Sequence, residues 1–209
     1  MALLTAAEAA LAIPGLTGTG EDTKIETLIT RAGRVFARYC GYPPASVGAN
    51  PTMESASYTL YNGLGGLVQV NPDGRHLRIM VWPVTAISAI YDDTAEAYGT
   101  AVTSTLYSLV DGDQGLVAYK TTAGAAWTDA GPYIRNIKIA CTAGYSTVPD
   151  DLKQAAMMLV KHWWALRHVQ GNQSVSQGQA NRGRREETMP GQVKEILAPL
   201  RLPGVILAA

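Results

Sequence analysis

The chain has 209 residues, which is enough for one domain with a substantial core or for two smaller lobes. Charged residues make up only 16% of it, and Lys plus Arg, at 17, balance Asp plus Glu, at 17, so the formal net charge is zero. Proteins whose main task is tight nucleic-acid binding usually carry a basic excess, so this composition excludes that class. A weakly charged surface suits extensive contact with other protein.

The N-terminal stretch predicts two helices. Thr5 followed by Glu8 is a capping box, which starts a short helix that ends at Pro14. In the second helix the apolar residues from Ile25 to Tyr39 recur at the spacing of one helical face. Gly41 supplies the left-handed residue that ends this helix.

From about residue 54 to 145 the pattern changes to period two, with turn residues such as Asn62-Gly63 between the apolar runs. This pattern predicts an antiparallel sandwich or small barrel. The candidate strands are 56–61, 67–70, 76–82, 85–91, 106–110, 115–119 and 133–141.

Pro149 opens a long helix that runs to about Gln170. A polar stretch without apolar periodicity follows, and Pro190 starts a last short helix over 190–199 before the apolar tail. The predicted class is therefore α+β, a small helical bundle built from both chain ends with an antiparallel β-sandwich or barrel-like insert. The expected division is 1–53 for the N-terminal helices, 54–145 for the insert and 146–209 for the part that completes the helical base.

No pattern of catalytic or metal-binding residues stands out. The chain lacks nucleotide-binding glycine motifs, a zinc-binding HExxH and a GxSxG elbow. His162 and His168 are six residues apart, so they lie on different flanks of a helix, and a metal pair would need a spacing of four. Asp92, Asp93, Asp111 and Asp113 occupy turn positions, although a weak calcium site at 111–115 is conceivable. We expect no enzyme activity, no cofactor and no metal.

Targeting and redox signals are equally sparse. The N-terminus lacks the basic start and apolar stretch of a secretion signal, and no window reaches the roughly 18 apolar residues of a membrane span. We therefore expect a protein made in the cytoplasm, without membrane contact. Cys40 and Cys141 fall in no metal or redox motif and are expected to be buried thiols.

Three segments carry a family resemblance. They are the N-terminal LLTAAEAALAI with EDTKIETLITRAGRVFARYCGY, the central WPVTAISAIYDD, and ACTAGYSTVPDDLKQAAMMLVKHWWALR. In order and spacing the sequence resembles the head–tail connector (adaptor) family of long-tailed bacteriophages. The resemblance implies a structural subunit in the neck of the virion, in a ring matching the twelve-fold portal. It also implies contact with the portal protein and with a stopper or tail-completion protein, around the channel through which DNA passes.

The long helix has apolar residues on more than one face. At 100° per residue one face, predicted to be core, is formed by Leu152, Ala155, Ala156, Leu159, Trp163 and Leu166. Met157 and Trp164 stand on a flank roughly 120–140° away. We expect them to pack against a neighbouring subunit, since Trp is a favoured interface anchor. The alternative is that the β-insert covers this flank within one chain.

Two further segments are candidates for contacts. Arg182, Arg184 and Arg185 lie in the polar stretch and would line the channel or meet an acidic portal surface, unless they form a merely solvated charge run. The tail, with Leu202, Val205, Ile206 and Leu207, would dock onto the portal, or fold back onto its own core.

Two other functions stay open beside the adaptor. One is a tail-completion or terminator protein of the same virion. The other is a monomeric β-type module that binds carbohydrate or protein. A stable monomer that binds glycans and ignores the portal would favour the second.

Overall fold

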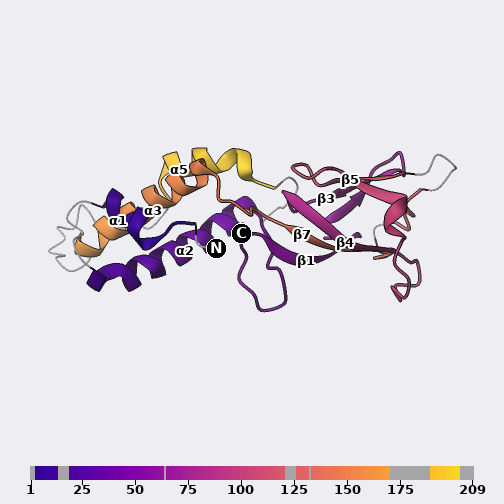
Figure 1. Cartoon of the computed structure of the whole chain (residues 1–209), viewed down its shortest axis with the longest axis horizontal. Helices are drawn as coiled ribbons and strands as arrows, with labels where there is room; N and C mark the ends of the chain where they lie inside the picture. Colours follow the sequence, from indigo (N-terminus) through magenta and orange to yellow (C-terminus); the bar gives the residue numbers. More distant parts are fainter. Residues whose placement is uncertain are drawn as a thin grey trace, which may run out of the picture. The chain divides into compact units, whose positions relative to one another are not determined.

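The computed structural model describes residues 3–13, 19–63, 65–120, 126–131, 133–169 and 189–202. The chain divides into two compact units. The helical unit comprises Met1–Cys40 and Val148–Arg201, and the β unit comprises Gly41–Thr147, joined by Leu202. The β unit is thus inserted between the N-terminal and C-terminal helices, which confirms the predicted α+β class (Figure 1).

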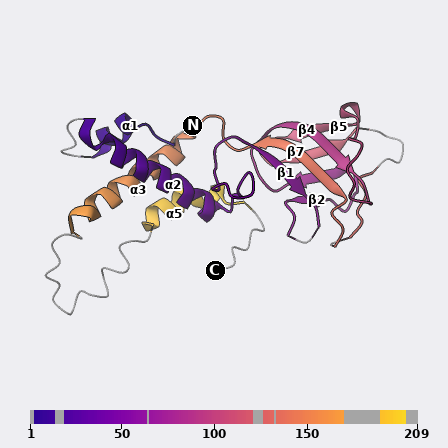
Figure 2. The same cartoon turned by 90° about the horizontal axis from the view of Figure 1, so that it is seen from below.

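Four α-helices form the helical unit as described: α1 (Ala6–Ala12), α2 (Asp22–Cys40), α3 (Asp150–Val169) and α5 (Gly191–Leu197). Short 3-10 turns at Thr19–Glu21 and Ala198–Leu200 adjoin α2 and α5. α3 packs on α1, α2 and α5, and Figure 2 shows α2 crossing α3 with α5 alongside. Neither chain end could bury its apolar helical faces alone, so the unit depends on segments from both ends.

The predicted helix ends are confirmed in atomic detail. The Glu8 amide donates to Thr5 Oγ1 (3.1 Å) and the Thr5 amide donates to Glu8 Oε2 (2.8 Å), which completes the capping box. α2 stops at Cys40 because Gly41 takes a φ of 84°, a left-handed conformation that glycine adopts without strain.

The core of the helical unit differs from the prediction in one respect. Along α3 the buried side chains are Leu152, Ala155, Ala156, Leu159, Val160 and Trp164. Trp164 therefore belongs to the buried face, while Trp163 and Leu166, which were predicted as core, are half-buried. The Arg31 guanidinium lies 4.7 Å from the centroid of the Trp163 ring, so that indole is covered by a cation rather than by the core.

The β unit contains all seven predicted strands, with shifted ends. They are β1 (Ala56–Tyr61), β2 (Val68–Val70), β3 (His76–Ile79), β4 (Val84–Asp92), β5 (Tyr107–Asp111), β6 (Leu116–Tyr119) and β7 (Ile137–Ala143). β3 stops at Ile79, earlier than predicted, and the amide of the next residue, Met80, donates to the Leu67 carbonyl at 2.8 Å.

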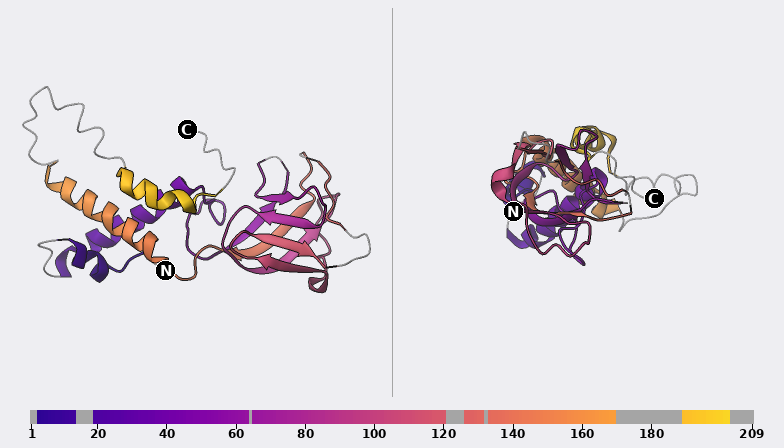
Figure 3. Two further views of the ribbon diagram at one scale, coloured as in Figure 1. Left: turned by 90° about the horizontal axis from the view of Figure 1, so that it is seen from above. Right: turned by 90° about the vertical axis from the view of Figure 1, so that its right-hand side faces the viewer.

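The strands form two antiparallel sheets, one in the order β1-β7-β4 and the other in the order β2-β3-β6-β5. Figure 3 shows the strands of the β unit from another side. Both sheets contribute fully buried side chains, among them Leu77, Ile79 and Val117 from one and Ile90, Ile137 and Ile139 from the other. β7, the last strand in the sequence, lies between β1 and β4, so the first sheet pairs a strand from the end of the insert with strands from its first half.

Candidate interaction surfaces

The two residues of the predicted interface pair on α3 differ in how far they are buried. Trp164 is only 7% exposed, so most of its side chain is already covered within one chain, whereas Met157 is half-buried. Trp164 is therefore buried without a neighbouring subunit, whereas the interface role of Met157 and the alternative that the β-insert covers this flank remain predictions. Met157 and the half-buried Trp163 keep surface that another molecule can reach.

The C-terminal candidates lie mostly outside the described residues. Leu202 is described and is 6% exposed. Val205, Ile206 and Leu207 fall outside the described residues, as do Arg182, Arg184 and Arg185. Their predicted roles in portal docking and channel contact therefore remain predictions.

A hollow that the sequence did not indicate lies within the helical unit. It measures about 630 Å³ and is lined by the start of α1, one side of α2 and the beginning of α3. Leu3, Leu4 and Ile29 supply apolar walls, and Lys153 pairs with Glu8 at 3.6 Å beside them. The Glu8 carboxylate and the lysine at its wall belong to a helix cap and a surface pair, since Glu8 accepts from the Thr5 amide and pairs with Lys153.

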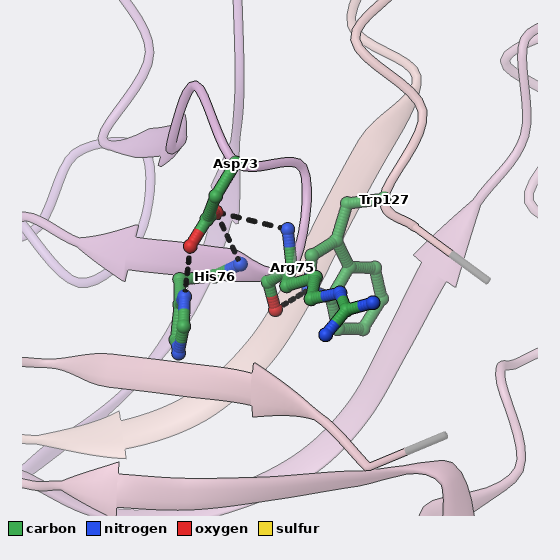
Figure 4. Close-up of polar contacts among 4 residues, drawn as sticks. All are labelled: Asp73, Arg75, His76 and Trp127. Atoms are coloured by element: carbon green, nitrogen blue, oxygen red, sulfur yellow. Dashed lines mark hydrogen bonds and ion pairs between the residues drawn. The ribbon is translucent and has the colours of Figure 1, made fainter. Parts of the chain in front are cut away.

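The β2–β3 turn is held by polar contacts (Figure 4). One Asp73 oxygen accepts from the amides of Arg75 (2.9 Å) and His76 (3.1 Å), and its other oxygen contacts His76 Nδ1. These bonds lower the pKa of the Asp73 carboxyl, His76 first among their causes. On the other side Trp127 Nε1 donates to the Arg75 carbonyl at 3.2 Å. Hydrogen bonds from both sides therefore hold the conformation of this turn.

Trp127 anchors this arrangement. Its side chain is 3% exposed, and its ring centroid lies 4.8 Å from that of Tyr119 and 6.4 Å from that of Tyr107. Its amide donates to the Gly74 carbonyl (2.7 Å), so the segment before β7 is joined directly to the β2–β3 turn.

A network of hydrogen-bonded polar side chains lies inside the β unit. Asn62 and Asn136 are both buried, and Asn62 Nδ2 donates to Asn136 Oδ1 at 2.7 Å. Asn136 Nδ2 in turn donates to Asp92 Oδ1 (2.9 Å) and to the Thr128 carbonyl (2.6 Å). The sequence pattern places Asn62 in a turn and Asn136 in a strand. Because the two residues are 74 positions apart, no local pattern predicts that they share a hydrogen-bond network.

One face of the first sheet presents a group of tyrosines. Tyr61 and Tyr91 both stand opposite Lys138 in the strand register. The Lys138 ammonium lies 5.0 Å from the Tyr91 ring centroid and 5.2 Å from that of Tyr98, which tilts against Tyr61. A cation held on aromatic faces in this way stabilises the surface locally.

Both cysteines are buried, and two of the aspartates predicted in turns are already hydrogen-bonded. Burial raises the pKa of the Cys40 thiol to about 12 and that of Cys141 to about 11, so both are unreactive thiols. Asp93, predicted as a turn residue, accepts from the amides of Ala95 and Tyr98. Asp92 and Asp111, also predicted in turns, are the last residues of β4 and β5, and Asp111 accepts from the amide of Gln114.

Within the described ranges, no cluster of His, Cys, Asp or Glu could hold a metal ion. No helix among the same residues is long and apolar enough to cross a membrane.

The chain thus combines a helical unit, built from its N-terminal and C-terminal helices, with an inserted β unit. The profile of the head completion protein family matches residues 3–202, and the chain belongs to this family of structural components of phage-like particles. The family is structural and not enzymatic.

Solved structures share the fold. A chain in the virion of a native gene transfer agent particle is similar with a TM-score of 0.56 and 19% identity, covering 96% of this chain and 90% of that chain. A chain in the neck of an empty gene transfer agent particle, computed with six-fold symmetry, has a TM-score of 0.53 and 20% identity, with the same coverage of 96% and 90%. At these identities the likeness concerns the fold. No curated protein matches this chain in sequence.

Proposed function

We propose that this head completion protein is a head–tail connector (adaptor) subunit, which forms a ring under the portal and links the DNA-filled head to the stopper or tail. The observation that carries the proposal is the family match, because it spans residues 3–202 and so includes both units. The similar fold of a chain in a gene transfer agent neck supports a place in the neck. The resemblance to phage adaptors supplies the twelve-fold ring and the partners on either side.

Mass photometry tests the adaptor function directly. The purified protein is measured alone and mixed with its cognate portal ring at micromolar concentration. We expect a portal complex heavier by a ring of subunits, even if the free protein is monomeric. An unchanged portal mass would remove the adaptor proposal and favour the terminator or the β-type binding module.

Docking onto the portal is assigned to the C-terminal tail. Because Leu202 is buried, the informative truncation removes residues 203–209 and leaves the described fold untouched. Val205, Ile206 and Leu207 would then be lost together, and we expect weaker portal binding with an unchanged thermal transition. A truncated protein that unfolds would instead show that the tail folds back onto its own chain.

The arginines of the polar stretch line the DNA channel or contact an acidic surface of the portal in this proposal. Neutralising Arg182, Arg184 and Arg185 to Gln separates these two roles. Loss of DNA retention in assembled particles with normal portal binding supports the channel, and loss of portal binding supports the portal surface. No change in either measurement would leave them as a solvated charge run.

A further inference from the structure

The outward face of α2 has a composition unlike that of the rest of the chain. At 100° per residue, seven residues of α2 fall within an arc of about 120° on the side opposite its buried residues. They are Thr23, Lys24, Thr27, Thr30, Arg31, Arg34 and Arg38, all of them exposed. This set, the α2 basic stripe, contains no carboxylate and no apolar side chain, although the whole chain has a formal net charge of zero.

The cations of the stripe are only partly balanced within the chain. Lys24 pairs with Glu21 at 3.2 Å, and Glu26 lies at the edge of the arc. Among the described residues no carboxylate lies within ion-pair distance of Arg31, Arg34 or Arg38. Arg31 is held over the Trp163 ring, which orients its guanidinium without neutralising it.

The spacing of these arginines fits a phosphate backbone. From Arg31 to Arg38 the helix rises by about 10 Å at 1.5 Å per residue. Over that length one strand of duplex DNA presents about three phosphates, at 3.4 Å each. Thr23 and Thr30 add hydroxyl donors on the same side, whereas the Thr27 hydroxyl donates back to the Thr23 carbonyl at 2.8 Å. Guanidinium groups interspersed with hydroxyls are the usual donors to phosphate oxygens.

A protein partner fits this face less well. Protein interfaces have an apolar or aromatic centre with charges at the rim, whereas the stripe has no apolar residue within its arc. Interfaces with DNA are more polar and strongly positive. The charge and composition of the stripe therefore favour a polyanion.

We propose that the α2 basic stripe binds the phosphate backbone of duplex DNA, without sequence preference. This inference rests on the proposed function, since the ring of an adaptor would bring many copies of the stripe around the DNA that passes through it. Three arginines per subunit, with no carboxylate of the described residues paired to them, give weak binding that lets DNA slide, and this agrees with a chain that has no basic excess overall.

The test measures binding of the full-length protein to a fluorescent duplex of roughly 30 base pairs, by anisotropy, over a series of salt concentrations starting at about 50 mM. The variant is R31Q/R34Q/R38Q. We expect its affinity at the lowest salt to fall by about tenfold or more. The slope of log K against log salt should decrease by about 2.7, at 0.9 per lost phosphate contact.

A matched control removes the same charge from the β unit. Arg75, Lys120 and Arg135 are exposed, and R75Q/K120Q/R135Q should change affinity by less than about twofold. The variant R31K/R34K/R38K keeps the charge while losing the Arg31 stacking, and it should retain binding within about threefold. Equal losses in the two Gln variants, or no DNA binding by the unmodified protein, would overturn the proposal.

Portal binding, measured on the same proteins by mass photometry, separates this inference from the proposed function. If R31Q/R34Q/R38Q binds DNA normally but no longer adds to the portal, the stripe binds protein and the proposal is wrong, while the adaptor function stands. If the unmodified protein ignores the portal but loses DNA binding only in this variant, the adaptor proposal fails and the phosphate-binding stripe stands.

Discussion

The helical unit and the β unit are held together by different kinds of interaction. In the helical unit α2 and α3, separated by more than a hundred residues, bury apolar faces against each other and against α5. In the β unit, polar side chains join loops to strands, as Asn62 and Asn136 do inside and as Asp73 does at the β2–β3 turn. The comparison teaches that apolar periodicity governs the first unit, whereas specific hydrogen bonds hold the loops of the second.

The largest effect is expected in the apolar core of the helical unit. Trp164→Ala should lower the free energy of unfolding by about 4 kcal/mol, because it leaves a large cavity at a site only 7% exposed. Urea unfolding followed by far-UV circular dichroism measures this loss.

Met157→Ala is the companion variant, at a half-buried position on the same helix. It should cost about 1 kcal/mol, and if this flank contacts a neighbouring subunit it should also weaken ring formation on the portal. A Met157→Ala protein that assembles normally would argue against the interface proposal. If only the Trp164→Ala protein failed to assemble, the cause would be its lower free energy of unfolding.

The next largest effect tests the polar closure of the β unit. Asn136→Ala should cost about 3 kcal/mol, because it leaves the buried Asn62 Nδ2 without its acceptor and removes the donor to Asp92 Oδ1 and to the Thr128 carbonyl. Thr128→Ala is the matched control, since only its main-chain atoms take part, and it should cost less than about 0.5 kcal/mol. Equal effects of the two substitutions would show that the network is not what closes this unit.

The sequence predicted the elements far better than their partners. Seven strands were located because period two and turn residues are local, but the β1-β7-β4 order is a long-range property without a local signal. Likewise an ideal helical wheel placed Trp163 in the core, whereas Arg31 covers Trp163 and the packed neighbours of α3 bury Trp164. The basic stripe of α2 was not predicted from the sequence, because its significance depends on which carboxylates approach it, and that is a property of the fold.

A smaller effect is expected at the start of α1, where Thr5 and Glu8 form the capping box. Thr5→Ala removes the acceptor of the Glu8 amide and should cost about 1 kcal/mol. Thermal unfolding of the full chain measures it, with Thr23→Ala as a control at an exposed position inside the stripe. A destabilisation as large as that of Asn136→Ala would mean that polar contacts govern both units, against the comparison drawn above.

The smallest effect is a pH dependence at the β2–β3 turn. His76 and the amides of Arg75 and His76 lower the pKa of the Asp73 carboxyl in the folded protein below its unfolded value. Its contribution is therefore fully present above the unfolded pKa and is lost as the pH falls through the folded pKa. Asp73→Asn cannot titrate, so its stability should decline less than that of the unmodified protein between about pH 5 and pH 2. The Glu8 carboxyl, whose pKa is lowered mainly by its bond to the Thr5 amide, titrates in the same direction. The informative quantity is thus the difference between the two proteins, measured by thermal unfolding at each pH, and parallel curves would show that the turn does not depend on the charge of Asp73.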